Sequence, residues 1–492
     1  MFLPFGEWTP DLPTIDSGGA LTATNVIPDA KSYRSFPSLV TYSNTSLGSR
    51  CKGGVFAIDA ASVAYNYAGD ASALYRLGNQ TFSDATRLAG GAYTVNSDDY
   101  WEFVNWGNTV IAVNGFADAP QTISLGNANF VALGGAPPKA RHITTLRDFV
   151  VMGNISDSAA NIFRIRWSAI NNAASWTVDA ATLADFQDLP SEGGWVQKVL
   201  GGEYGVILQE RSVWRMTFVG SPLIFQFDKI MDNLGAYIAQ AAVRFQNLVF
   251  FLATDGFYSF DGNQINPIGR GKIDKFFFAD LDTNNLSRVH AAVDPANKIV
   301  MWAYPSVTSP NGGNPDKLII YNWAFQRWSI IEGLNIELLI NSITTGYTLD
   351  GLDAVTTNLD SLAWPLDSKQ WTGGQVILAA YNSAHRLSRF NGSAMAATVD
   401  TGEQRLSGDM KTFISRVRPY IVGNSASAQV AIISRNVLTA SASITSATSP
   451  NSTGFVPTRN SAFYQRIRVT TVGASFDHLY GVDIEAQSEG YR

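Results

Sequence analysis

Short apolar strands separated by tight turns recur along most of this sequence, and this pattern predicts an all-β fold. The stretch "LVFFLATDGFYSFDGNQI" (Leu248–Ile265) shows one unit: an apolar run, an Asp-Gly turn, an alternating run and another turn. The dipeptides Asn114-Gly115, Asp255-Gly256 and Asn391-Gly392 suit two-residue hairpin turns, because these residues tolerate positive φ. A sheet with two apolar faces cannot bury both alone, so such units must pack against one another.

Related units recur as "LYRLGNQTF" from Leu74, "FYSFDGNQI" from Phe257 and "HRLSRFNGSAM" from His385. The separations between matching turns correspond to several steps of about 46 or 47 residues, the length of one four-stranded propeller blade. A pair of β-sandwiches would also produce strands and glycine turns, and this alternative stays open. We expect a six-bladed β-propeller over residues 46–400, with a loop insertion around residues 345–375.

The two ends of the chain differ from this pattern. Residues 1–45 are broken up by prolines and predict an extended N-terminal arm. Residues 401–492 hold strands around a Ser/Thr/Ala-rich middle and predict a small C-terminal β domain. The best helix candidate, "LGAYIAQAAVRF" (Leu234–Phe245), fits a strand equally well.

Composition and charge exclude several classes of function. The net charge is −6 and only 15% of residues are charged, which argues against tight binding to nucleic acid. Cys51 is the only cysteine, and the four histidines (His142, His290, His385 and His478) lie far apart, so neither a disulfide nor a metal pair is expected. The start resembles no secretion signal, and no apolar run reaches the ~18 residues of a membrane span. We expect a soluble product made in the cytoplasm, without a cofactor.

No catalytic motif stands out, so we expect a protein that is not an enzyme. The densest acidic group is Asp98, Asp99 and Glu102, for which a turn with solvated acids is the simpler interpretation. The "GRGK" stretch could seat a phosphate, but a basic turn between strands is simpler. One acidic stretch contains Asp350, Asp353, Asp360 and Asp367. It lacks the spacing of a calcium-binding loop, so a solvated surface loop is the simpler interpretation.

Arginines alternate with apolar residues in three places: Arg164 and Arg166, Arg416 and Arg418, and Arg466 and Arg468. Period-two spacing places both arginines of a pair on one face of a strand. These faces could simply be solvated. Because arginine suits ion pairs at interfaces, the two C-terminal pairs are also candidate contacts with a neighbouring subunit or another protein.

An ordered series of segments covers nearly the whole chain from about residue 25: "NVIPDAKSYRSFPSLV", "LYRLGNQTF", "GGAPPKARHITTLRDFVVMGN", "WSAINNAASWTVDAATLADFQDLPSEGG", "GVILQERSVWRMTFVGSPLIFQFDKI" and "FYQRIRVTTVGASFDHLYGVDIEA". This series resembles the tail nozzle, or tail hub, proteins of short-tailed bacteriophages, also described as tail tubular protein B or packaged-DNA stabilisation proteins. None of these segments is a catalytic signature, so the resemblance rests on their order.

The resemblance implies a β-propeller protein that forms a homo-hexameric ring below the head-to-tail adaptor and encloses the DNA exit channel. It implies that the protein is located in the virion tail, is made in the host cytoplasm, helps to retain packaged DNA and attaches tail fibres or spikes. Contact with DNA would be transient and non-specific. On this interpretation Asp98, Asp99 and Asp353 are candidate channel-facing acids.

Two other functions compete with this interpretation. A propeller enzyme or lectin that acts on host surface polysaccharide would use the supply of 12 Trp and 18 Tyr, since exposed aromatic rings stack on sugars. The same aromatic residues also serve β-sheet cores well. The other competitor is a head-decoration protein, which would lie on capsid faces instead of at the tail.

Overall fold

The computed structural model is mostly β-strand over the residues that it describes, which are 1–15, 18–344, 358, 376–423, 428–473 and 475–489. Within this part lie one α-helix, α1 (Asp274–Asp280), and three short 3-10 helices, η1 (Ser191–Gly193), η2 (Ala239–Ala241) and η3 (Thr283–Arg288). The expected all-β class is therefore confirmed. No helix in the described part is long and apolar enough to span a membrane.

Four antiparallel meanders of four strands each follow one another between residues 53 and 232. All five residues of the second strand in the last meander are buried, because that strand is covered on both faces. In order, the strands are β6 (Gly53–Ile58), β7 (Ala64–Gly69), β8 (Leu74–Gly78) and β9 (Thr81–Asp84); β10 (Glu102–Trp106), β11 (Thr109–Val113), β12 (Gln121–Ser124) and β13 (Val131–Ala132); β14 (Lys139–Leu146), β15 (Phe149–Ser156), β16 (Ala160–Trp167) and β17 (Asp185–Asp188); and β18 (Val196–Leu200), β19 (Gly205–Gln209), β20 (Ser212–Gly220) and β21 (Ile224–Asp232).

Three further units of four strands follow, and the last one is completed by a strand from near the N-terminus. The strands are β22 (Val243–Phe245), β23 (Leu248–Ala253), β24 (Gly256–Phe260) and β25 (Ile265–Pro267); β26 (His290–Asp294), β27 (Ile299–Tyr304), β28 (Lys317–Asn322) and β29 (Arg327–Ile331); and β30 (Ile336–Ile343), β31 (Val376–Asn382), β32 (Leu387–Ala394) and the N-terminal β5 (Pro37–Thr41).

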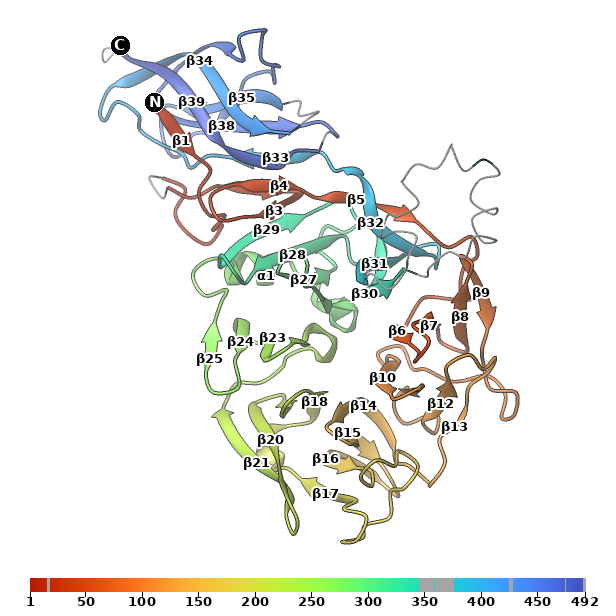
Figure 1. Ribbon diagram of the computed structural model, residues 1–492. Coiled ribbons are helices and arrows are strands. Elements are labelled where there is room, and N and C mark those ends of the chain that lie inside the picture. Colours follow the sequence, from red (N-terminus) through yellow and green to blue (C-terminus); the bar gives the residue numbers. More distant parts are fainter. Residues whose placement is uncertain (16–17, 345–357, 359–375, 424–427, 474, 490–492) are drawn as a thin grey trace.

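These units are arranged in a circle, as Figure 1 shows. Strand β6 contacts both β10 and β30, β10 contacts β14, and β14 contacts β18. The 3-10 helix η2 contacts β18 and β26, and β26 contacts β30, so the contacts run around the whole circle. The arrangement is propeller-like. Six of the units are separate sheets and β26–β29 belongs to a larger one, so the number of blades stays a prediction.

The C-terminal part consists of two sheets. In one, the long strands β34 (Lys411–Val422) and β39 (His478–Glu489) pair along their length. That sheet is completed by β1 (Phe2–Pro4), β3 (Val26–Pro28), β4 (Tyr33–Ser35) and β37 (Val456–Ala462). The other contains β2 (Thr22–Thr24), β33 (Ala397–Asp400), β38 (Tyr464–Thr471), β35 (Ala428–Arg435) and β36 (Ser443–Ile444). Because β2 pairs with both β29 and β33, this second sheet continues into β26–β29 and has nine strands.

The described residues of the expected arm, 1–15 and 18–45, are largely extended and supply five strands, which are divided between the two parts of the molecule. Their aromatic side chains Phe5, Trp8, Tyr33 and Phe36 are buried. The arm is therefore part of the core that joins the circle of sheets to the C-terminal sheets. The expected loop insertion at 345–375 lies almost wholly outside the described residues.

The largest apolar cluster lies at the junction of the two parts. It contains Trp302 and Trp328 from the circle of sheets together with Val399, Ile432 and Leu479 from the C-terminal sheets. Aromatic side chains fill its centre, and the rings of Trp302 and Trp328 stack at 6.0 Å. The two parts therefore share one core instead of meeting at a polar boundary.

Several local predictions differ from the structure. The turn between β23 and β24 is Thr254-Asp255, one residue earlier than expected. Asn391-Gly392 lies inside β32, and Asn114-Gly115 precedes an irregular connection instead of forming a hairpin. The stretch 234–245 forms η2 and the short strand β22, and the α-helix comes later, at 274–280. In each case tertiary contacts override a weak local preference.

Candidate functional site at the centre of the circle

A cavity of about 270 Å³ lies where the units converge at the centre of the circle, and we call it the central cavity. Its wall comes from the connection before β10, from β14 and β15, from the start of β18, and from η2 and η3. Residues from three consecutive units and from the connections that contain η2 and η3 thus face one space. Its ionisable side chains include Asp98, Asp99, Arg141, His142 and Glu210.

Beside the cavity lies a buried carboxylate, Glu102 on β10, which is 8% exposed. Its Oε1 accepts hydrogen bonds from Lys198 Nζ at 2.6 Å, His142 Nδ1 at 3.0 Å and Gln240 Nε2 at 3.1 Å. These three donors lie on β14, on β18 and in η2, so the carboxylate links β10 to all three.

The surroundings of Glu102 determine its ionisation. Burial by itself would raise the pKa of this carboxyl group, because it disfavours the charged form. The charges and hydrogen bonds of Lys198 and His142 outweigh burial and lower the pKa of Glu102 from 4.5 to about 2. The group is therefore an anion at neutral pH and a poor proton donor.

Acidification is expected to lower the free energy of unfolding between about pH 4.5 and about pH 2. The stabilisation by Glu102 is fully present above the unfolded pKa and is lost as the pH falls through the folded pKa of about 2. The full difference corresponds to about 3 kcal/mol. Urea unfolding at about pH 6 and about pH 3 should show a larger loss in the wild type than in Glu102→Gln. An equal loss in the two proteins would contradict this assignment.

The acids that precede β10 lie at the wall of the cavity. Asp99, 8% exposed, accepts a hydrogen bond from Asn96 Nδ2 at 2.8 Å and forms an ion pair with Arg141 at 3.3 Å. The neighbouring Asp98 is exposed. The Lys52 ammonium donates to the carbonyl oxygen of Asp99 at 3.2 Å and holds this turn from the other side. The turn is therefore fixed, and Asp98 is its solvent-facing carboxylate.

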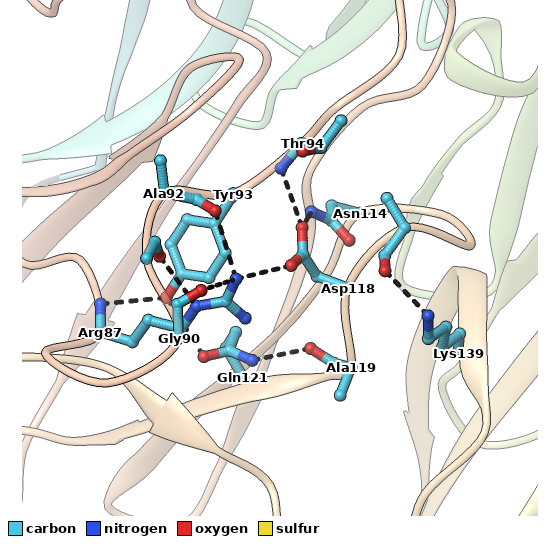
Figure 2. Close-up of polar contacts among 12 residues, drawn as sticks. Arg87, Gly90, Ala92, Tyr93, Thr94, Asn114, Asp118, Ala119, Gln121 and Lys139 are labelled. Carbon is cyan, nitrogen blue, oxygen red and sulfur yellow. Dashed lines mark hydrogen bonds and ion pairs between the residues drawn. The ribbon is translucent and has the colours of Figure 1, made fainter.

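A second network, drawn in Figure 2, anchors the same connection. Arg87 donates to Asp118 Oδ1 at 2.8 Å, and the backbone N–H of Thr94 and the side chain of Asn114 donate to Asp118 Oδ2. Burial would raise the pKa of Asp118, but these hydrogen bonds and the Arg87 charge lower it overall. The long connection from β9 to β10 is thus tied down before it reaches the cavity.

Another buried carboxylate connects the last unit of the circle to the first. Glu337 on β30, 2% exposed, accepts from His385 Nδ1 at 2.6 Å and from the backbone N–H of Cys51 at 3.0 Å. Burial raises the pKa of the Cys51 thiol well above its ordinary value, so this thiol stays protonated and unreactive at neutral pH.

The site offers fixed charges instead of a proton-transfer pair. Glu102 and Asp99 are each held by a cation, and we find no group of three or more His, Cys, Asp or Glu residues in the described part that could hold a metal ion. Trp195 and Tyr237 add aromatic surface to the same wall. Such a combination suits the binding of a polar molecule.

Comparisons with known proteins show only weak likenesses. No protein-family model matches the sequence. No curated protein matches it either. Among solved structures, a functionally unknown protein from Desulfotomaculum acetoxidans aligns over 62% of this chain and 93% of its own, with a TM-score of 0.37 and 11% identity. Two variants of an exo-β-1,3-galactanase from Phanerochaete chrysosporium, each with β-1,3-galactotriose, align over 82% of this chain and 97% or 98% of theirs, with a TM-score of 0.26 and 9% identity.

The structure places the candidate channel acids as follows. Asp98 and Asp99 line the central cavity inside one chain, and Asp353 lies outside the described residues. Their role in a DNA channel stays a prediction. The expectation that Asp98, Asp99 and Glu102 form a solvated turn is wrong for the last two, because both are buried and paired.

The arginine pairs follow the predicted period. Arg466 and Arg468 both reach the fully buried Asp400, and Arg468 does so with two hydrogen bonds of 2.8 Å. Arg416 and Arg418 both lie over the ring of Phe455, at 4.3 and 5.1 Å. Both pairs are therefore engaged within the chain, and Arg416 also forms an ion pair with Glu485. The interface role of all four arginines stays a prediction.

Sequence reasoning missed the partners of Glu102. Lys198 and Gln240 lie far from it in the sequence and carry no motif, and His142 drew attention only as an isolated histidine. Nothing in the sequence distinguishes Trp195 from the other eleven tryptophans. The only local signal was a charged residue, Lys198, within the apolar run that begins a unit, where an unpaired charge would be costly.

Proposed function

We propose that this chain is a structural subunit of the tail of a short-tailed bacteriophage. Six copies would form the nozzle or hub ring below the head-to-tail adaptor, surround the DNA exit channel and carry fibres or spikes. Support comes first from the ordered resemblance of segments along nearly the whole chain. The acidic, weakly charged composition agrees with a conduit that must release DNA, because a basic channel would retain it.

The single structural observation that carries this proposal is the shared core between the circle of sheets and the C-terminal sheets. A nine-stranded sheet runs from one part into the other through β2, and one apolar cluster contains residues of both. A subunit built in this way resists bending between its parts, since any hinge would expose buried aromatic side chains such as Trp302 and Trp328. Rigidity of this kind suits the wall of a pressurised channel.

We further propose that the propeller has seven blades, one more than the sequence pattern suggested. In this arrangement β5 closes the last blade, because it pairs with β32 in the same sheet as β30 and β31. Closing a circle with a strand from the other end of the chain leaves no open seam between the first and last units.

The C-terminal sheet that contains β34 and β39 offers a surface for a neighbouring subunit. Its outer face carries the exposed Arg416 and Arg418, the exposed Tyr420, and Phe2, whose ring contacts Tyr420 edge-on at 5.6 Å. Arginine and aromatic residues are enriched where proteins associate. Contacts through this face would leave the core unchanged.

Electron microscopy of particles from a producing lysate, with a gold-labelled antibody against this chain, tests the proposal. Label concentrated at the single tail vertex is the expected result. The control is the same preparation after the antibody has been absorbed with purified protein. Label on capsid faces, or protein found only free in solution, would overturn the tail assignment.

A further inference from the structure

The side chain of Asn154 is a buried part of the cavity wall. Asn154, which lies on β15 and is 2% exposed, donates from Nδ2 to the carbonyl oxygen of Val196 at 2.9 Å. This bond identifies the other amide atom as the oxygen, and that Oδ1 accepts no hydrogen bond from the residues that the structure describes. This oxygen has almost no accessible surface, so the polar contacts of a bound molecule come from other residues of the wall.

The same cavity presents an aromatic surface. Trp195 immediately precedes β18, lines the cavity and is 43% exposed, although tryptophan usually buries most of its ring. The Arg141 guanidinium lies 5.6 Å from the centre of this ring, and Tyr237 lies on the same wall. An exposed indole in a concave site can cover the apolar face of a ligand.

Hydrogen-bond donors and hydrogen-bond acceptors surround this aromatic surface. Asp98 and Asp99 contribute carboxylate oxygens, and Arg141 contributes N–H donors. Gln197 donates to Glu210 at 3.3 Å, and both residues line the cavity. Three carboxylates against one guanidinium disfavour an anionic ligand. A neutral molecule with several hydroxyl groups matches this set, because each hydroxyl both donates and accepts.

We propose that the central cavity binds one neutral pyranose residue of a glycan, with its apolar face on Trp195 and its hydroxyl groups on Asp98, Asp99 and Arg141. The volume of about 270 Å³ lies just below the usual range for ligand pockets and admits a single ring instead of a chain of sugars. This inference is independent of the tail assignment, since it concerns the inside of one subunit and requires no neighbour.

Ligand-observed saturation-transfer NMR with the full chain tests this site. The probes are four methyl glycosides, those of β-glucose, β-galactose, α-mannose and β-N-acetylglucosamine, each titrated to about 100 mM. At least one probe is expected to bind saturably with a Kd of about 1 to 10 mM. Trp195→Ala should weaken that binding at least about tenfold, and Asp98→Ala should weaken it as well. The matched control is Phe325→Ala, because Phe325 is similarly exposed, at 45%, and lies outside the cavity.

Thermal melts of all variants show whether they are folded, and both substituted cavity residues are exposed enough for the fold to survive. The proposal is overturned if none of the four glycosides binds saturably. It is equally overturned if a folded Trp195→Ala protein binds as tightly as the wild type. Binding of calcium ions in place of glycosides, lost in Asp98→Ala, would also refute it and show a cation site.

Discussion

Replacing Lys198 with methionine is expected to destabilise the fold by about 3 to 5 kcal/mol. Methionine keeps the length and flexibility of the lysine stem, so the change removes chiefly the ammonium group. Glu102 would keep the hydrogen bonds from His142 and Gln240 but would lose its nearest cation at a site where it is 8% exposed. An uncompensated charge in such a place costs far more than an exposed pair contributes.

Urea unfolding at neutral pH measures this effect, and Lys229→Met is the matched control. Lys229 also forms an ion pair, with Asp232 at 2.9 Å, but both side chains are substantially exposed. Its loss should change the free energy of unfolding by less than about 1 kcal/mol. The double variant combines Lys198→Met with Glu102→Gln. Much of the stability lost in Lys198→Met should return in it, because the unpaired carboxylate is gone from this site. Equal effects of the two lysine substitutions would argue against the network.

Deletion of residues 1–45 is expected to prevent cooperative folding altogether. The segment supplies strands to both C-terminal sheets and the fourth strand of the last unit in the circle. It also buries Phe5, Trp8, Tyr33 and Phe36. Removing one large aromatic side chain from a core costs about 3 to 5 kcal/mol, and a whole domain is stable by only about 5 to 15 kcal/mol.

Circular dichroism during heating tests this expectation: the truncated chain should show no sharp transition. The control is Lys31→Ala, a change at an exposed position of the same segment, which should melt like the wild type. A truncated protein with an unchanged cooperative transition would show that the segment is an appendage. The deletion therefore cannot isolate an attachment role in particle assembly, and exposed substitutions such as Arg418→Glu are the better probes of neighbouring subunits.

Features that depend on nearest neighbours follow from the sequence alone. The unit at 248–265 forms the strands β23 and β24 and enters β25, because alternating apolar residues and a tight turn favour a hairpin wherever it packs. The arginine pairs lie on single faces because side chains in a strand alternate with a period of two. The extended nature of residues 1–45 likewise follows from their prolines.

Turn positions and short helices depend on what packs around them. Asn391-Gly392 is a good turn sequence, yet it lies inside β32, which pairs with β5 from the other end of the chain. No local pattern contains that partner, so the sequence cannot show that a strand continues there. The α-helix at 274–280 is too short to give a clear helical period, and its buried Phe277 packs on Phe257 with ring centres 4.8 Å apart.

The central cavity is the clearest case of a feature decided by tertiary structure. The sequence determines that the chain forms packed β-units of about one blade in length and that it lacks a local catalytic motif. It does not determine that Glu102, His142, Lys198 and Gln240 meet, because their separations reflect the closure of the circle and not a local spacing. Pairing within a meander joins strands that are neighbours in the sequence, whereas the burial of a charge depends on every unit around it.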